Sequence, residues 1–256
     1  MKFLCIIITI FFGQCAHADT VLRKLMTVGQ SAAWSGIGRL NVSGGDLDRL
    51  CSGVLISDSH VLTAAHCVVN RSTGKVYTPN MIQFLAGWGN EGASALGQAH
   101  HIFVHKSYEY SHTVSDELVS TDIALIELLT PMNANGIRPF LLSRPPAIGQ
   151  RISLISYVEK KLEAPLIEEK CNILSVKNQI IVSNCVVDFG ASGAPIFTEI
   201  NGELMITSIV SAKGKVNGRN VSLGVSLEEP LSELLGQLRK VSSIAQMEKL
   251  NFFTGN

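Results

Sequence analysis

Three short segments constrain the sequence most, because their order and contexts fit few folds. They are TAAHC at residues 63–67, DIAL at 122–125 and GASGAP at 190–195. Each supplies one residue of a candidate relay: His66, Asp122 and Ser192. A serine hydroxyl is a poor nucleophile at neutral pH, so it needs a base within hydrogen-bond reach and a third group that orients that base. One segment alone would be a weak signal, whereas all three together are a strong one.

The order of the three residues along the chain argues against two other folds that carry the same relay. An α/β-hydrolase places its histidine after the serine, and no histidine follows Ser192 here. A subtilisin-like order needs an aspartate before the histidine. Asp46, Asp48 and Asp58 precede His66, but that fold alternates strands and helices and this sequence does not.

The apolar pattern predicts an all-β protein. Short runs rich in Val, Ile and Thr are bounded by Gly, Asn, Asp, Ser or Pro, which is typical of sandwiches and barrels. These runs lie at residues 51–56, 60–63, 81–86, 102–105, 123–129, 152–158, 179–182, 204–210 and 223–227. One helix is expected after Pro230, where Leu231, Leu234, Leu235 and Leu238 recur at helical spacing.

The first 18 residues resemble a secretory signal peptide. Lys2 is the charged start, residues 3–12 are the apolar run, and AHA at 16–18 has the small-x-small pattern of a cleavage site. The run is too short to span a bilayer as a stable helix. We therefore expect export, with a mature chain from Asp19. A short pro-segment within residues 19–33, ending near Arg23 or Lys24, stays open.

Cysteine usage agrees with export. Removal of the signal peptide leaves four cysteines, an even number that predicts two disulfides in an exported chain; they are Cys51, Cys67, Cys171 and Cys185. Three pairings are open. The local choice joins Cys51 to Cys67 and Cys171 to Cys185, at sequence separations of 16 and 14. Each loop would contribute roughly 3 kcal/mol on the chain-entropy model.

Charge and metal-ligand spacing exclude several classes of partner. The chain has 21 basic and 21 acidic residues, so neither a basic stripe for nucleic acid nor a polybasic patch for membranes is expected. The cysteines form no C-x-x-C pair. His101 and His105 are four residues apart, which is about 13 Å along a strand. We expect no metal and no cofactor.

In these residues the chain resembles the trypsin-like (chymotrypsin-fold) serine endopeptidases, in their bacterial secreted branch. The match covers roughly residues 34–240. CSGVLI at 51–56 and VLTAAHC at 61–67 match the family's histidine region, and DIALI at 122–126 matches its aspartate region. SIVS at 208–211 resembles the strand that pairs with bound substrate, and GVS at 224–226 a later pocket strand.

The resemblance implies two six-stranded antiparallel β-barrels with a C-terminal helix. The barrel that carries the histidine and the aspartate would span residues 34–132, and the barrel that carries the serine and the final helix would span 133–240. The site would lie in the cleft between them. Residues 241–256 would form a tail.

The resemblance also implies a role for each site residue. Ser192 attacks the peptide carbonyl, His66 transfers the proton, and Asp122 orients His66. The backbone N–H groups of Gly190 and Ser192 form the oxyanion hole, and the Cys51–Cys67 bridge closes the histidine loop. The expected function is a secreted or periplasmic, monomeric serine endopeptidase that acts on proteins or peptides, without a nucleic-acid partner or a membrane after signal removal.

Two other functions stay open beside this one. The first is a catalytically silent homologue that serves as a binding protein, against which the intact relay argues. The second is a quality-control protease with chaperone activity, against which the lack of a second peptide-binding domain argues.

The sequence departs from trypsins around the serine. Ala191 stands where animal trypsins carry an aspartate that pairs with the new N-terminal amine, so we expect activity without such an insertion. Counting six residues back from the serine places Val186 at the pocket base, which would favour apolar side chains. If the spacing differs from that of trypsins, Asp188 would lie at the pocket base instead and favour basic side chains. The walls would be Ser211, Ala212, Lys213 and Gly224, and Lys213 could narrow the pocket or attract an acidic side chain.

Overall fold

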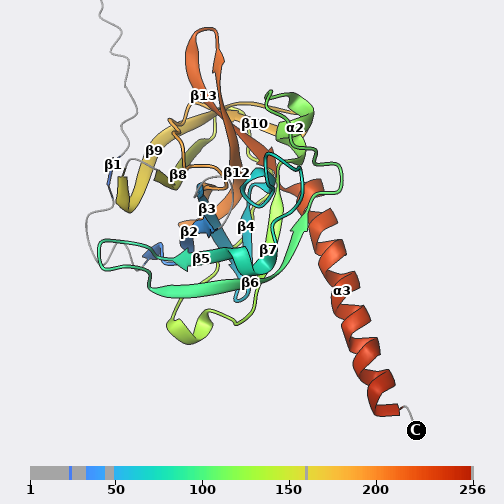
Figure 1. Cartoon of the computed structure of the whole chain (residues 1–256). Coiled ribbons are helices and arrows are strands. Elements are labelled where there is room, and N and C mark those ends of the chain that lie inside the picture. The colour runs from blue at the N-terminus through green and yellow to red at the C-terminus, as the bar shows by residue number, and fades with distance from the viewer. Residues whose placement is uncertain (1–22, 25–32, 44–48, 159–160, 255–256) are drawn as a thin grey trace, which may run out of the picture.

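The computed structural model of the chain describes residues 23–24, 33–43, 49–158 and 161–254. The predicted signal peptide at 1–18 and most of the segment at 19–33 lie outside these residues. Two β-barrels and a C-terminal helix make up the described part (Figure 1).

The first barrel is closed and antiparallel. Its strands follow the order β2-β3-β4-β7-β6-β5. Alternating burial along these strands places side chains such as Leu40 and Phe84 inside the barrel. The strands are β2 (Ile37–Val42), β3 (Arg49–Ser57), β4 (His60–Thr63), β5 (Ile82–Ala86), β6 (Ala95–Val104) and β7 (Ala124–Leu128).

The second barrel has the strand order β9-β10-β13-β12-β11-β8, and the pairing of β8 with β9 closes the ring. The short β1 (Arg23–Lys24) adds to the outer side of β9. The predicted all-β class with two six-stranded antiparallel barrels is thus confirmed. The strands are β8 (Arg151–Val158), β9 (Lys161–Lys177), β10 (Ile180–Ser183), β11 (Pro195–Ile200), β12 (Glu203–Val216) and β13 (Arg219–Ser226).

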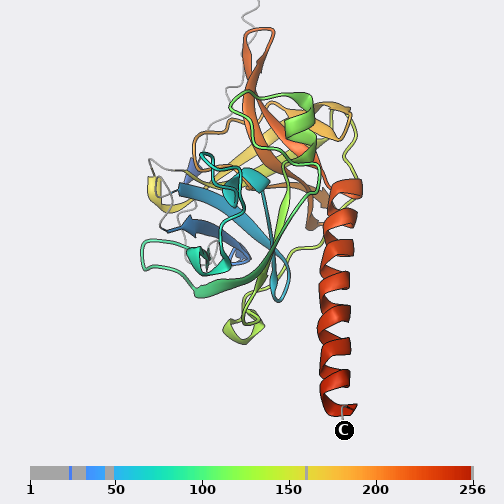
Figure 2. The same ribbon diagram turned by 45° about the vertical axis from the view of Figure 1, so that its right-hand side comes forward.

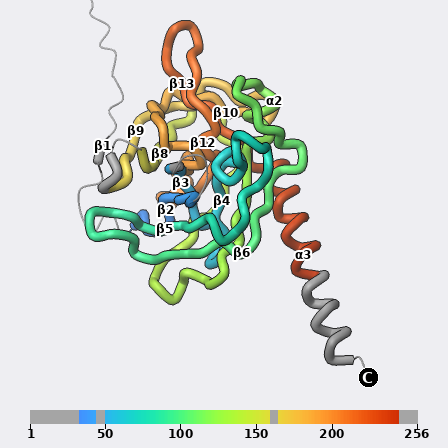
Figure 3. Tube along the Cα trace, viewed as in Figure 1, coloured from blue at the N-terminus to red at the C-terminus, as the bar shows by residue number. Residues whose placement is uncertain are grey.

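The two barrels share one apolar cluster. Val54 and Leu62 of the first barrel belong to the same buried cluster as Tyr157, Phe197 and Val225 of the second. Burial of each such side chain contributes about 1.5–3 kcal/mol, so the cluster holds the barrels in a fixed relation. The tube in Figure 3 shows the two sets of strands packed side by side.

The C-terminal helix α3 (Glu228–Thr254) is longer than the sequence led us to expect. Its first turns bury Leu231 and Leu234, and Gln237 Nε2 donates to the carbonyl of Val104, 3.2 Å away; Figure 2 shows this start of the helix beside the barrels. The tail expected from residue 241 stays a prediction, and its residues as far as Thr254 continue this helix. No glycine or proline interrupts residues 237–254.

In the part of the chain that the structure describes, four short helices lie between strands. They are η1 (Ala65–Cys67), η2 (Pro79–Met81), α2 (Asp116–Thr121) and η3 (Asn133–Asn135). Two of them, η1 and α2, carry or adjoin the site described below. Among the described residues, no helix is long and apolar enough to cross a membrane.

Candidate active site

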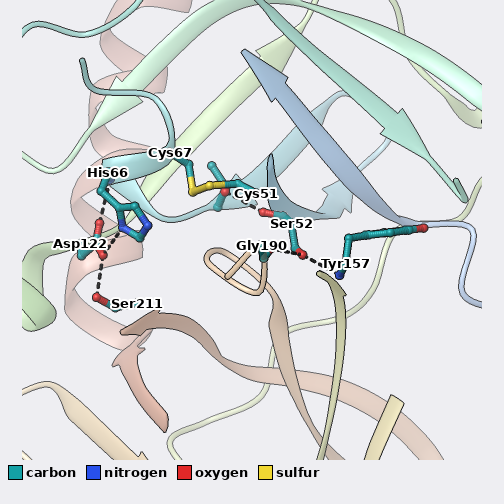
Figure 4. The surroundings of a disulfide bond; sticks show 9 residues. Cys51, Ser52, His66, Cys67, Asp122, Tyr157, Gly190 and Ser211 are labelled. Atoms are coloured by element: carbon teal, nitrogen blue, oxygen red, sulfur yellow. Dashed lines mark hydrogen bonds and ion pairs between the residues drawn. A yellow bond between two sulfur atoms is a disulfide. The ribbon is translucent and has the colours of Figure 1, made fainter. Parts of the chain in front are cut away.

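His66 is fixed to the wall of the first barrel. It lies in η1, directly after β4, between two fully buried residues, Ala65 and Cys67. The structure forms the local disulfide Cys51–Cys67, which ties this turn to β3 (Figure 4). The turn that carries His66 is therefore held by its buried neighbours and by the disulfide. The His66 side chain itself is 14% exposed.

Asp122 is placed by the end of α2. Ser115 caps the start of that helix, because its hydroxyl accepts from the N–H of Leu118 at 3.2 Å. Asp122 is the C-cap residue, and β7 begins two residues later. Its side chain is fully buried, so its carboxylate requires hydrogen-bond donors.

The carboxylate of Asp122 accepts three hydrogen bonds, which Figure 4 shows. The backbone N–H of His66 donates to Oδ1 at 2.9 Å, and His66 Nδ1 lies 2.7 Å from Oδ2. The hydroxyl of Ser211 donates to Oδ2 at 2.6 Å. Because Nδ1 faces the carboxylate, a neutral His66 carries its proton on Nδ1 and presents Nε2 as a base.

Burial and charge act in opposite directions on His66. Burial disfavours the imidazolium, but the charge of Asp122 and its hydrogen bond favour it more strongly, so that the pKa of His66 is raised above its ordinary value. A base of raised pKa next to a carboxylate suits proton transfer near neutral pH.

Ser192 lies in a loop built from two consecutive turns. The N–H of Ala191 donates to the carbonyl of Asp188 at 3.0 Å, and the N–H of Ala194 donates to the carbonyl of Ala191 at 2.9 Å. The third residue of each turn, Gly190 and then Gly193, has a positive φ of 98° and 76° respectively. A type II turn needs that conformation, which glycine adopts without steric cost.

One cavity of about 360 Å³ brings the relay residues together. His66, Asp122 and Ser192 line it, and so do four of the predicted pocket residues, Asp188, Ser211, Ala212 and Lys213. Val186 lines a neighbouring cavity instead, and Val187 takes its place here. Gly224 is absent from the lining and pairs with Val210 inside the sheet.

The sequence matches the family model described as trypsin over residues 27–227. The chain belongs to the trypsin family. That match covers both barrels and every residue of the candidate site.

Relatives of this trypsin-family chain are distant. It is 28% identical over 204 residues to phenoloxidase-activating factor 3 of Holotrichia diomphalia, covering 63% of this chain and 56% of that protein. It is 36% identical over 108 residues to a trypsin of Phaedon cochleariae, covering 41% and 37%. The chain thus spans about half the length of these relatives, or less.

Solved structures show the same fold. A Glu endopeptidase in complex with MPD superposes with a TM-score of 0.70 at 17% identity, covering 87% of this chain and 98% of that one. The protease Anisep from Arthrobacter nicotinovorans does so with a TM-score of 0.63 at 17% identity, covering 78% and 93%.

The wall of the cavity beside Ser192 carries an ion pair in this trypsin-family protein. Lys213 Nζ lies 3.3 Å from Asp188 Oδ1 and 3.9 Å from the ring centre of Phe189. Both charged side chains are about half exposed. The charge of Asp188 is therefore largely balanced by Lys213, while the ring of Phe189 supports the ammonium through a cation–π contact.

Aromatic side chains that the sequence analysis did not select also line the cavity. Tyr108, Tyr110 and His112 alternate in the segment before α2. Burial and the charge of Asp122 raise the pKa of Tyr108, so its hydroxyl stays protonated at physiological pH. Alternating aromatic residues ahead of the aspartate segment were the signal that could have found these side chains.

Among the described residues, one cluster of potential metal-ligand atoms adjoins this site. The residues of the described part whose donor atoms lie within 4.8 Å of one another are Cys51, His66 and Cys67. Both sulfurs are joined in the disulfide, so neither offers a thiolate. The second disulfide, Cys171–Cys185, ties β9 to the segment that leads into the Ser192 loop.

Proposed function

We propose that this chain is a serine endopeptidase that cleaves peptide bonds through His66, Asp122 and Ser192. The observation that carries the proposal is the pair of hydrogen bonds between His66 and Asp122, in a cavity that Ser192 also lines. The match to the trypsin family supports the same chemistry.

The reaction would proceed in two steps. Ser192 Oγ attacks the scissile carbonyl carbon while its proton passes to His66 Nε2, and Asp122 stabilises the imidazolium. The N–H groups of Gly190 and Ser192 would donate hydrogen bonds to the carbonyl oxygen as it becomes negatively charged. His66 then protonates the leaving amine, which departs and leaves an acyl-enzyme. Water activated by His66 hydrolyses the ester bond and regenerates the Ser192 hydroxyl.

We further propose that the protein is exported and acts on proteins or peptides, as a monomer without a cofactor. Two disulfides support an oxidising compartment, outside the cell or in the periplasm. Membership of a bacterial secreted branch stays a proposal. The Arthrobacter protease shares the fold, whereas the sequence relatives include animal proteins.

Turnover of an unstructured protein such as casein tests the function. The wild-type chain should release peptides, and the Ser192→Ala variant should release none above background. A folded wild-type chain that releases no peptide from casein or from a peptide library would favour the alternative, a catalytically silent homologue that binds a partner.

A further inference from the structure

We propose that Ser52 is a positioning residue that holds the oxyanion loop from the opposite barrel. This inference rests on the proposed function, because it assigns the loop around Gly190 to the oxyanion hole. Ser52 follows Cys51 on β3 and is fully buried.

Ser52 contacts the loop on both sides of Ala191, and Figure 4 shows its contact with Gly190. Its hydroxyl donates to the carbonyl of Gly190 at 3.0 Å, and its backbone N–H donates to the carbonyl of Ser192 at 2.8 Å. The same hydroxyl accepts from the N–H of Tyr157 at 2.9 Å. One residue of the first barrel thus joins two parts of the second, the Ser192 loop and β8.

The hydroxyl suits this place because it is donor and acceptor at once. It meets the N–H of Tyr157 with a lone pair and the carbonyl of Gly190 with its proton. An alanine here would leave a buried donor and a buried acceptor unpaired, which is costly for each group. The side chain of Ala191, also buried, has no polar atom to brace the loop from within.

The peptide group that joins Gly190 to Ala191 lies between the two proposed oxyanion donors. Its carbonyl, from Gly190, is fixed by Ser52, and its N–H, from Ala191, is fixed by the carbonyl of Asp188 at 3.0 Å. Rotation of this peptide group would re-aim the N–H groups of Gly190 and Ser192 on either side of it. Gly190 has a φ of 98° and no side chain, so it resists such rotation little by itself.

A comparison of Ser52→Ala with a matched control tests the proposal. The control is Thr207→Val, because Thr207 is also buried and its hydroxyl donates to a backbone carbonyl, that of Arg144, at 3.1 Å. Ser52→Ala should lower kcat by about tenfold or more, since loss of one oxyanion donor costs roughly 10²–10³. The KM and the acid-side pKa of kcat/KM should stay unchanged. A peptide aldehyde, whose adduct places an oxyanion in the hole, should bind more weakly in proportion to kcat.

A readout that needs no activity separates this proposal from the proposed function. Hydrogen exchange of the amides at residues 188–193 should accelerate in Ser52→Ala and stay as in the wild type in Thr207→Val. If Ser52→Ala does not fold, Ser52→Gly, which leaves room for a water, serves for the same measurement. Unchanged exchange, or an equal loss of kcat in both variants, would overturn the role of Ser52. A wild-type chain without turnover would overturn the proposed function. The exchange data would still show whether Ser52 holds the loop at residues 188–193.

Discussion

Asp122 holds His66 at two points, the backbone N–H and the imidazole Nδ1, at 2.9 and 2.7 Å. The backbone contact places the turn that carries His66, and the imidazole contact sets the orientation of the ring. The relation therefore determines both where the imidazole lies and which of its nitrogens faces the carboxylate. It also raises the pKa of the base, with a consequence for the dependence of activity on pH.

The acid limb of kcat/KM should titrate above 6.5, the ordinary pKa of histidine. His66 must be neutral to accept the serine proton, so activity should rise as pH increases through its raised pKa. The same shift makes protonated His66 stabilise the fold below pH 6.5, a contribution that is lost as pH rises through the folded-state pKa. A pH series of kcat/KM measures the limb, and a midpoint below 6.5 would contradict this account.

Ser211→Ala should weaken catalysis without unfolding the chain. The Ser211 hydroxyl donates to Asp122 Oδ2 at 2.6 Å, and a hydrogen bond to a charged group contributes about 1.5–3 kcal/mol. Part of that loss should appear in kcat, as a fall of about tenfold, because Asp122 then supports the imidazolium less firmly. Steady-state kinetics measure the change. Full activity in the variant would show that this hydroxyl is dispensable.

Gly193→Ala should destabilise the protein far more than Gly218→Ala. Both glycines have a similar positive φ, 76° and 77°, and alanine in that region costs about 1 kcal/mol. A Cβ at Gly193 would overlap with Thr63 Oγ1 and with the carbonyl oxygen of Ser52, whereas a Cβ at Gly218 would meet nothing within 4 Å. The overpacking should add roughly 1–3 kcal/mol. Urea unfolding of both variants checks the difference, and equal values would argue against this contact between the barrels.

Lys213→Ala should shift the preference of the cavity toward basic side chains. In the wild type Lys213 lies 3.3 Å from Asp188, so that carboxylate is already balanced. Removal of the ammonium would leave Asp188 to attract arginine or lysine of a substrate. Because both groups are about half exposed, cleavage after basic residues should increase only a few-fold. Cleavage of matched peptides with arginine, leucine or glutamate before the scissile bond measures it. Faster cleavage of the glutamate peptide in the variant would contradict the assignment of this preference to Asp188.

The apolar pattern predicted the all-β class because many strands alternate or run apolar between turn residues, and the resemblance to the trypsin-like family implied the two barrels. β9 was missed, since Pro165 and several charged residues hide a strand of 17 residues. The short α2 was missed as well, although Ser115 followed by two acidic residues is a helix-start signal. β9 takes its form from pairing with β8 and β10, contacts that a local pattern does not contain.

That His66, Asp122 and Ser192 lie around one cavity could be expected from the distinctive segments around them, while their role as a relay stays a prediction. The pocket could not be predicted, because the loop between Cys185 and Ser192 sets which side chains face the cavity, and counting residues placed Val186 where Val187 lies. The contact of Ser52 with Gly190 was equally invisible. The two residues are 138 positions apart, and a serine in a strand gives no sign of a partner in the other barrel.

Labelling of the folded protein with a fluorophosphonate probe tests the central claim most directly. The probe bonds covalently to a serine only where a base and an oxyanion hole activate it. The account predicts one adduct, mapped by mass spectrometry to Ser192 and absent from Ser192→Ala, without prior processing of the N-terminus. A folded wild-type chain that stays unlabelled, or an adduct at another serine, would contradict it.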